Sequence, residues 1–296
     1  MDARSNHSVD GLFAAASSDE RKYWGFLVFI KVLNDGPKEI ASLTFTKNLM
    51  RCLVNQLAAE DRLLHRSAVR AAKSIQARSS REPEFTTTAL RGLMGGNGAI
   101  NFDQVTKTKT VEKIISDVPP AVLNQLMPFF EDLIINPDTD DEKTAASRRQ
   151  QLANIFQTIT RSQVTAEKDE VSEDLDSAIE NVLSVLARYT YFNPSEKSTP
   201  NRPQPPISDA TKDFFRNKIM SCLNIAIAGR KNAATLAYRL MHNIRDMEGS
   251  EEYGKFIIEM GETVNESTQN SFKILLKLNR KVIRGFGSSA NYLPSS

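Results

Sequence analysis

The chain has 296 residues, of which 40% are hydrophobic and 25% charged, and its formal net charge is +2. A chain of this composition can bury a large core. Because the net charge is close to zero, the overall charge gives no reason to expect binding to nucleic acid. The charge is nevertheless uneven. Residues 1–116 carry 17 basic and 12 acidic side chains, residues 117–180 carry 5 and 14, and residues 208–296 carry 13 and 9. This alternation predicts a surface that meets more than one kind of partner.

Cysteine usage and hydropathy indicate the compartment. Cys52 and Cys222 each lie in an apolar helical pattern, so we expect two buried thiols rather than a disulfide, and hence a reducing compartment. The first ten residues are polar, unlike a secretory leader. The longest apolar run, YWGFLVFI, is too short to cross a bilayer. We therefore expect a soluble intracellular protein with no membrane partner.

The N-terminal elements begin with an expected disordered tail over 1–16. A capping box of Ser17 and Glu20 then opens a helix that runs through 22–33. The following Asp-Gly-Pro triplet ends that helix. Further helices are predicted, in chain order, at 46–58, 61–79, 84–94, 106–116, 120–135, 140–162, 173–191, 208–228, 232–248, 252–264 and 267–284.

The spacing of these elements predicts the fold class. Paired helices restart near 19, 61, 106, 208 and 252, at intervals close to the ~40–47 residues of HEAT and armadillo units. We therefore predict an all-α fold, an α-solenoid of HEAT/armadillo-like helical pairs over 17–192 and 208–286, with a compact helical bundle as the alternative. The Pro-rich segment 193–207 is expected to be an extended surface loop or a disordered linker, and 287–296 a C-terminal tail.

A glycine-rich stretch, GGNGAINFDQVTKTKT at 95–110, raises the question of a phosphate loop. The Walker A motif fails because no Lys follows Gly98 before Lys107, and the dinucleotide fingerprint fails because its third Gly is replaced by Asn101. We expect the glycines to provide positive φ in a sharp turn. Asp103 is expected to cap a helix that starts near Thr106.

The remaining candidate sites for catalysis also have structural explanations. Asp138-Thr139-Asp140 resembles a metal-binding pair, but Thr139 with Glu142 forms a capping box, and the acids fit the first turn of the next helix. No His or Cys spacing suits zinc, and no nucleophile motif is present. We therefore predict no enzyme, no metal, no cofactor and no small-molecule substrate.

Two predicted helices carry basic stripes at helical spacing. The first stripe is Arg62, Arg66, Arg70 and Lys73, opposite the apolar side formed by Leu64, Ala68, Ala71, Ala72 and Ile75. The second stripe is Lys273, Lys277, Arg280 and Arg284, with Lys281 alongside. Each is either the solvated face of a repeat helix or a contact for a phosphate backbone. Neither is interleaved with the aromatic residues that stack bases, so we expect little sequence reading.

Three lysines follow the glycine-rich stretch: Lys107, Lys109 and Lys113. If they lie at the beginning of a helix, the helix dipole disfavours their charge. Cations at such an end, beside free backbone N–H groups, predict a contact with an anion, either an RNA backbone or an acidic partner.

The segments NLMRCLVNQLAAEDRLLHRSAVRAAKSI (48–75) and GLMGGNGAINFDQVTKTKTVEKII (92–115) resemble one family closely. It is the fungal DNA polymerase phi, or Myb-binding protein 1A, family of nucleolar proteins. ASRRQQLANIFQTITRS (146–162) fits this family more loosely. Members of the family are much longer, so we expect the chain to be a fragment or a truncated form.

The resemblance implies a helical-repeat protein of the nucleus and nucleolus that acts in rRNA transcription and ribosome biogenesis. On this basis we expect a non-enzymatic scaffold whose partners are pre-rRNA, rDNA chromatin or ribosome-assembly proteins. One alternative is a transcription co-regulator that binds proteins on a solenoid face. A third, implied by the family name, is a DNA polymerase that uses Asp138 and Asp140 to hold metal.

Overall fold

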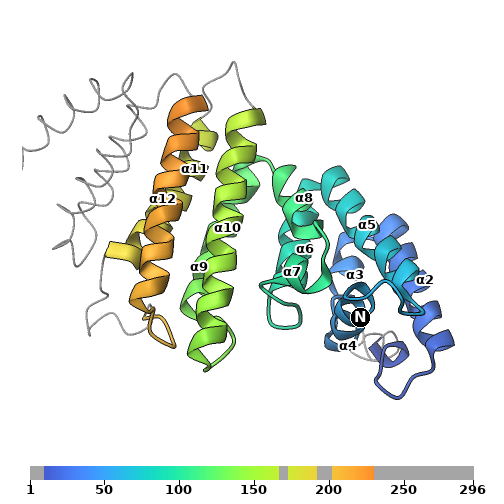
Figure 1. Cartoon of the computed structure of the whole chain (residues 1–296). Helices are drawn as coiled ribbons and strands as arrows, with labels where there is room; N and C mark the ends of the chain where they lie inside the picture. Colours follow the sequence, from blue (N-terminus) through green and yellow to red (C-terminus); the bar gives the residue numbers. More distant parts are fainter. Residues whose placement is uncertain (1–9, 167–172, 192–201, 230–296) are drawn as a thin grey trace, which may run out of the picture. The chain divides into compact units, whose positions relative to one another are not determined.

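The structure, a computed structural model, describes residues 10–166, 173–191 and 202–229 (Figure 1). These residues are all-helical and contain no strand, which confirms the predicted all-α fold class. The chain divides into two compact units, Met1–Ser162 with Pro203–Pro206 and Gln163–Arg202 with Ile207–Ser296. In the described part of the chain, no helix is both long and apolar enough to cross a bilayer.

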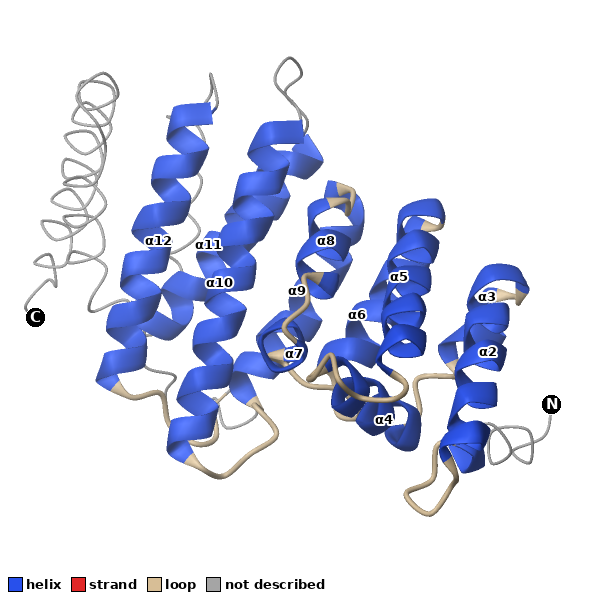
Figure 2. Cartoon of the chain, turned by 45° about the vertical axis from the view of Figure 1, so that its right-hand side comes forward, coloured by secondary structure: helices blue, strands red, loops and turns tan. Residues whose placement is uncertain are grey.

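The helices of the first unit form two rows (Figure 1, Figure 2). One row contains α2 (Asp19–Asp35), α5 (His65–Arg81) and α8 (Thr110–Ser116), in which α5 packs between α2 and α8. The other contains α3 (Lys38–Ser42), α6 (Pro83–Met94) and α9 (Pro120–Ile135), in which α6 packs against both neighbours. The unit also contains α4 (Lys47–Leu57), α7 (Phe102–Thr106) and most of α10 (Glu142–Ala166).

Small residues place α5 at the centre of the first unit. Ala68, Ala71 and Ala72 line its inner side and are between 0% and 4% exposed. Because their side chains are short, α2, α6 and α8 can all approach this helix closely. Larger buried side chains on the neighbouring helices fill the remaining space, among them Phe29, Leu53, Phe85 and Ile115. Each contributes roughly 1.5–3 kcal/mol on burial.

Residues 10–16 are ordered against the first unit, which corrects the prediction of a disordered tail for this stretch. Phe13 is 1% exposed, and its ring meets that of Phe26 edge to face, with centroids 5.1 Å apart. The Asp10 carboxylate accepts a hydrogen bond from Asn48 Nδ2 at 2.7 Å. The burial of Phe13 and the hydrogen bonds of Asp10 together hold this segment, because they offset the entropy of ordering it.

Several helix boundaries differ from the sequence prediction. α5 begins at His65 rather than 61, since the preceding residues form turns. The predicted helix 106–116 is divided at Lys107, which takes a left-handed φ of 55° and ends α7. Ser18 rather than Ser17 caps α2, accepting the Arg21 N–H at 3.3 Å. The starts of α5 and α8 each lie four residues later than predicted, because turn and loop residues precede both helices.

The end of the Pro-rich segment is anchored to the first unit. Pro203 is buried, and Gln204 N donates to Ile135 O, at the last residue of α9, at 2.9 Å. The guanidinium of Arg149 donates to the carbonyl oxygens of Pro205 and Pro206 at 2.6 and 3.3 Å. The expected loop or linker over 193–207 therefore ends in a docked stretch, while 192–201 lies outside the described residues.

In the second unit, the described helices are α11 (Glu173–Tyr191) and α12 (Asp209–Gly229), which pack against each other. Their buried side chains include Ile179, Val182, Leu186, Phe215 and Ile219. Cys222 is a buried thiol here, as Cys52 is in α4 of the first unit, in agreement with the prediction of two buried thiols. Burial raises the pKa of the Cys52 thiol.

Candidate nucleic-acid interface

The outer side of α5 carries three exposed cations, Arg66, Arg70 and Lys73. They are spaced at i, i+4 and i+7, so they lie along one side of the helix. The residues predicted to form the inner side of the helix are all buried: Leu64, Ala68, Ala71, Ala72 and Ile75. Arg62 is exposed as well, although it lies in the turn before α5 rather than in the helix. Within the described residues, none of these four side chains makes an ion pair.

Lys113 on α8 adjoins this row of cations. Ser80 Oγ, near the end of α5, donates to Asp117 Oδ2, just after α8, at 3.2 Å. Lys73 lies two turns before Ser80, and Lys113 lies one turn before Asp117, so the two lysines are on adjoining sides of neighbouring helices. We refer to the five residues as the α5 cationic face: Arg62, Arg66, Arg70, Lys73 and Lys113.

The lysines after the glycine-rich stretch are not placed as predicted. Lys107 ends α7, and Lys109 precedes α8 and pairs with Glu112 at 3.4 Å. Lys113 lies in the last turn of α8, where the helix dipole favours a cation. The prediction that all three crowd an unfavourable helix start is therefore wrong, because the helix begins at Thr110 rather than near Thr106.

Asp103 occupies the N-terminus of α8. Its carboxylate accepts the backbone N–H groups of Thr110 and Val111 at 2.8 and 3.0 Å, and that of Glu112 at 2.9 Å. Burial raises the pKa of Asp103, while these hydrogen bonds act in the opposite direction. The side chain thus caps a helix, as predicted, but caps α8 from within α7. Its carboxylate accepts the backbone N–H groups that were expected to be free for an anion, so that premise is wrong. Contact of Lys107, Lys109 and Lys113 with an anion stays a prediction.

Gly95 and Gly98 are required for close approach, not for positive φ, whereas a side chain on Gly96 would meet no neighbour. Gly95 has a φ of −80°, and none of the three has a φ in the left-handed region. A Cβ on Gly98 would collide with the carbonyl oxygen of Leu93, because the loop folds back on α6. Ala99 N donates to that same oxygen at 2.8 Å. Within 95–110, the residue with a left-handed φ is instead Lys107.

The glycine loop lines a pocket of about 390 Å³ beside Arg91 and Arg148. Arg91 lies over the ring of Phe129 at 5.1 Å, and Arg148 donates to the carbonyl oxygens of Pro137 and Asp138. The pocket is formed at the C-terminal ends of α6 and α9, where the helix dipole disfavours an anion. Arg148 is therefore committed to carbonyl oxygens and Arg91 to an aromatic ring, an arrangement unlike a phosphate cradle.

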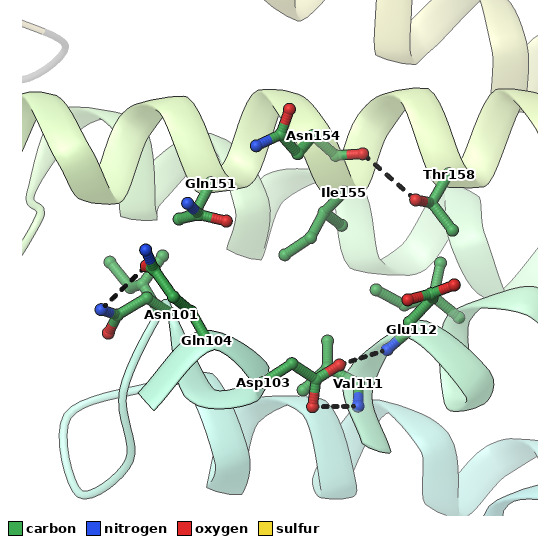
Figure 3. A pocket seen from close by; sticks show the side chains of 11 residues that line it. Asn101, Asp103, Gln104, Val111, Glu112, Gln151, Asn154, Ile155 and Thr158 are labelled. Carbon is green, nitrogen blue, oxygen red and sulfur yellow. Dashed lines mark hydrogen bonds between the residues drawn. The ribbon is translucent and has the colours of Figure 1, made fainter. Parts of the chain in front are cut away.

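A second pocket, of about 140 Å³, lies between α7, α8 and α10 (Figure 3). Its polar lining is dominated by side-chain amides, those of Asn101, Gln104, Gln151 and Asn154. Val111 and Ile115 contribute buried apolar surface. Local sequence patterns do not predict this pocket, because its residues come from segments about 50 positions apart. Only the helical spacing of Gln151, Asn154 and Thr158 gave a signal.

Two buried arginines were also missed. Arg78 in α5 is 3% exposed and donates to the carbonyl oxygens of Val32 and Leu33, near the end of α2, at 3.1 and 3.0 Å. Arg149 in α10 is 1% exposed and also donates to Ile134 O at 2.9 Å. Burial lowers the pKa of Arg149 to about 10, so the side chain remains charged at neutral pH.

The acidic stretch before α10 forms a helix cap. Asp141 accepts both the backbone N–H and the hydroxyl of Thr144, at 2.8 and 2.6 Å. These hydrogen bonds lower the pKa of Asp141. The capping interpretation is confirmed, with Asp141 rather than Thr139 in the capping position. Among the described residues, no group of three or more His, Cys, Asp or Glu side chains could hold a metal ion.

The second basic stripe, from Lys273 to Arg284, lies outside the described residues, as do the predicted helices 232–248, 252–264 and 267–284 and the tail 287–296. Of the two predicted basic stripes, the one on α5 lies within the described residues, and it forms most of the α5 cationic face. Whether it binds nucleic acid remains a prediction.

Comparison with known proteins shows which sequences the chain is related to. The family model for DNA polymerase phi matches residues 6–289. The rDNA transcriptional regulator pol5 of Schizosaccharomyces pombe is 27% identical over 285 residues, which cover 92% of this chain and 29% of that protein. The rDNA transcriptional regulator POL5 of Saccharomyces cerevisiae is 33% identical over 125 residues, 41% of this chain and 12% of that protein. The chain thus spans less than a third of either relative, and no solved structure matches it. With a match over nearly its whole length, the chain belongs to the DNA polymerase phi family.

Proposed function

We propose that the chain acts in rDNA transcription as a non-enzymatic, helical nucleic-acid-binding region of the nucleus and nucleolus, with a role in ribosome biogenesis. Both relatives are named as rDNA transcriptional regulators, which supports a role in rDNA transcription. The observation that carries the binding mode is the α5 cationic face. Its partner is the phosphate backbone of rDNA or of pre-rRNA.

The position of these cations favours a polyanion. Several arginine side chains elsewhere in the unit are committed to carbonyl or carboxylate groups, Arg78 and Arg149 among them. Arg66, Arg70 and Lys73 instead extend from a helix held rigidly on its opposite side. Consecutive cations along one helix can neutralise consecutive phosphates, and each contact releases a counterion.

We further propose that the two rows of helices in the first unit are part of a HEAT/armadillo-like array. The starts of α2, α5 and α8 at residues 19, 65 and 110 keep the predicted spacing. In such an array, one helix of each pair contributes to a continuous surface, which suits an extended partner.

The binding proposal is tested by charge reversal in the full chain. Fluorescence anisotropy would follow a labelled 30-base-pair DNA duplex and a labelled 30-nucleotide oligouridine RNA across a salt series. Arg66→Glu/Arg70→Glu should lower affinity at least about tenfold at low salt and reduce the slope of log affinity against log salt by about 1.8 for duplex DNA. The comparison of the two probes shows whether duplex or single strand is preferred.

A matched control makes the same change in net charge elsewhere. Lys38→Glu/Lys143→Glu reverses two lysines of α3 and α10 and should leave the salt slope within the error of the unchanged chain. Equal losses in the two variants would mean that only net charge matters. Unchanged binding in the α5 variant would rule the α5 cationic face out.

A further inference from the structure

The amide-lined pocket between α7, α8 and α10 differs in chemistry from the α5 cationic face. Asn101 and Gln104 come from one wall, and Gln151 and Asn154 from the other (Figure 3). No lysine or arginine is among its described lining residues, whereas Asp103 and Glu112 both are. Because cations supply most of the affinity for phosphates and carboxylates repel them, this lining does not suit a nucleic-acid backbone.

The amide side chains retain hydrogen-bonding capacity. Each carries two N–H donors and one carbonyl acceptor. Within the described residues, the side chains of Gln151 and Asn154 make no hydrogen bond, and Gln104 receives one long contact from Asn101 at 3.4 Å. Gln151 and Ile155 extend from α10 toward the wall that holds Gln104 (Figure 3). A ligand between the walls would thus meet donors and acceptors from both sides.

An extended polypeptide backbone has the matching pattern. Its N–H and C=O groups alternate along the chain and point to opposite sides. A primary amide can pair with one N–H and one C=O of that backbone at the same time. Asp103 is committed to the N-terminus of α8, so Glu112 is the carboxylate that a basic residue of the ligand would meet. Glu112 is exposed and its pair with Lys109 at 3.4 Å is a surface contact, for which a Lys or Arg of the ligand would compete.

The floor of the pocket provides room for one apolar side chain. Val111 and Ile115 lie beneath it, and Ile155 borders it from α10. Its volume of about 140 Å³ is close to the ~150 Å³ of an apolar cavity that admits a benzene ring. A leucine or phenylalanine side chain therefore fits.

We propose that this pocket is a docking site for an extended, basic peptide segment of a partner protein. The amides of Gln104 and Gln151 hold the peptide main chain from opposite walls. One apolar side chain of the peptide enters over Val111 and Ile115, and a neighbouring Lys or Arg meets Glu112. The site is separate from the α5 cationic face and does not depend on the function proposed for it.

The test uses the full chain and peptides of known sequence. A displayed library of random 12-residue peptides is selected on the unchanged chain, and the enriched peptides are synthesised with a fluorescent label. Gln104→Ala/Gln151→Ala should weaken their binding at least about tenfold in fluorescence anisotropy. N-methylation of the central backbone amides should weaken binding by a similar factor, because it removes donors without changing side chains.

The matched control is Gln150→Ala, which removes the same kind of side chain from α10 at a position outside the pocket. A second variant, Asn154→Arg, fills the pocket and leaves the buried residues of α10 intact. Circular dichroism verifies that each variant is folded. Binding that N-methylation and both pocket variants leave unchanged would overturn the proposal, and so would a library that yields no peptide.

The same variants separate this site from the proposed nucleic-acid interface. Gln104→Ala/Gln151→Ala should bind oligouridine RNA as the unchanged chain does. If RNA binding falls while peptide binding is retained, the pocket accommodates nucleic acid and the proposal is wrong. Conversely, Arg66→Glu/Arg70→Glu should keep the affinity for the selected peptides.

Discussion

Arginines at the two ends of α5 have different roles. Arg78, in the last turn, is 3% exposed; its guanidinium contacts two carbonyl oxygens of α2, the Glu82 carboxylate at 3.0 Å and the face of the Phe85 ring at 4.8 Å. Arg66 and Arg70, in the first two turns, are exposed. Residue type is therefore a poor guide to role. An arginine that satisfies carbonyls at the end of another helix is structural, whereas one on the outer side is available to a partner.

Arg149 extends the comparison to α10. It is 1% exposed and contacts three carbonyl oxygens, those of Ile134, Pro205 and Pro206. Within the part of the chain that the structure describes, these contacts include no carboxylate, so oriented backbone dipoles compensate the charge. This arginine joins α9, α10 and the end of the Pro-rich segment, which explains why that stretch belongs to the first unit.

The largest expected effect follows from replacing Arg149. Arg149→Met keeps much of the side-chain volume but leaves buried carbonyl oxygens without a donor, so the free energy of unfolding should fall by about 3 kcal/mol. Trp24 in α2 is the chain's only tryptophan, so its fluorescence during urea titration reports on the first unit. Arg148→Met, one position earlier and only partly buried, should cost less. Equal losses would contradict the role assigned to Arg149.

A smaller effect is expected at Arg78. Arg78→Lys keeps the charge but cannot contact the two carbonyl oxygens and the carboxylate of Glu82 at once, because the ammonium lacks the planar fork. We expect a loss of about 2 kcal/mol in the same urea titration. The control is Arg66→Lys on the same helix, which should change stability by less than ~0.5 kcal/mol. If Arg78→Lys leaves the free energy of unfolding unchanged, a positive charge at this position is sufficient and the planar guanidinium is not needed.

The smallest expected effect on stability belongs to the α5 cationic face. Arg66→Ala/Arg70→Ala should leave the free energy of unfolding within ~0.5 kcal/mol of the unchanged chain, because the side chains it removes are exposed. The same variant should weaken binding of the DNA duplex measured by anisotropy. If the variant loses stability but keeps its affinity for DNA, Arg66 and Arg70 are structural residues like Arg78. The proposed difference between the two ends of α5 would then be wrong.

Local sequence signals predicted much of the helix content. Pro83 and Pro120 stand at the first positions of α6 and α9, where the fixed φ of proline suits a helix start. The alternation of alanines and cations in 61–79 predicted which side of α5 is buried. These features depend on residues within one or two turns of each other, so no tertiary information was needed.

The misplaced features depend on contacts between distant residues. Asp103 was assigned to the nearest helix start, but it caps α8, beginning seven positions later, because Lys107 takes a left-handed φ and turns the chain back. Phe13 was assigned to a disordered tail, since its partner Phe26 lies in another element. The amide pocket joins α7 and α10, and no local pattern pairs their residues.

The sequence by itself determined the helical class, the buried side of α5, the buried thiols and the resemblance to the DNA polymerase phi family. Each depends on periodicity or on a contiguous motif. Only the tertiary structure decided which arginines are structural, where the glycine loop folds back on α6, and that amides from two distant helices share one pocket. Those features depend on which backbone carbonyls and which helix faces meet after folding, and local sequence patterns do not contain that information.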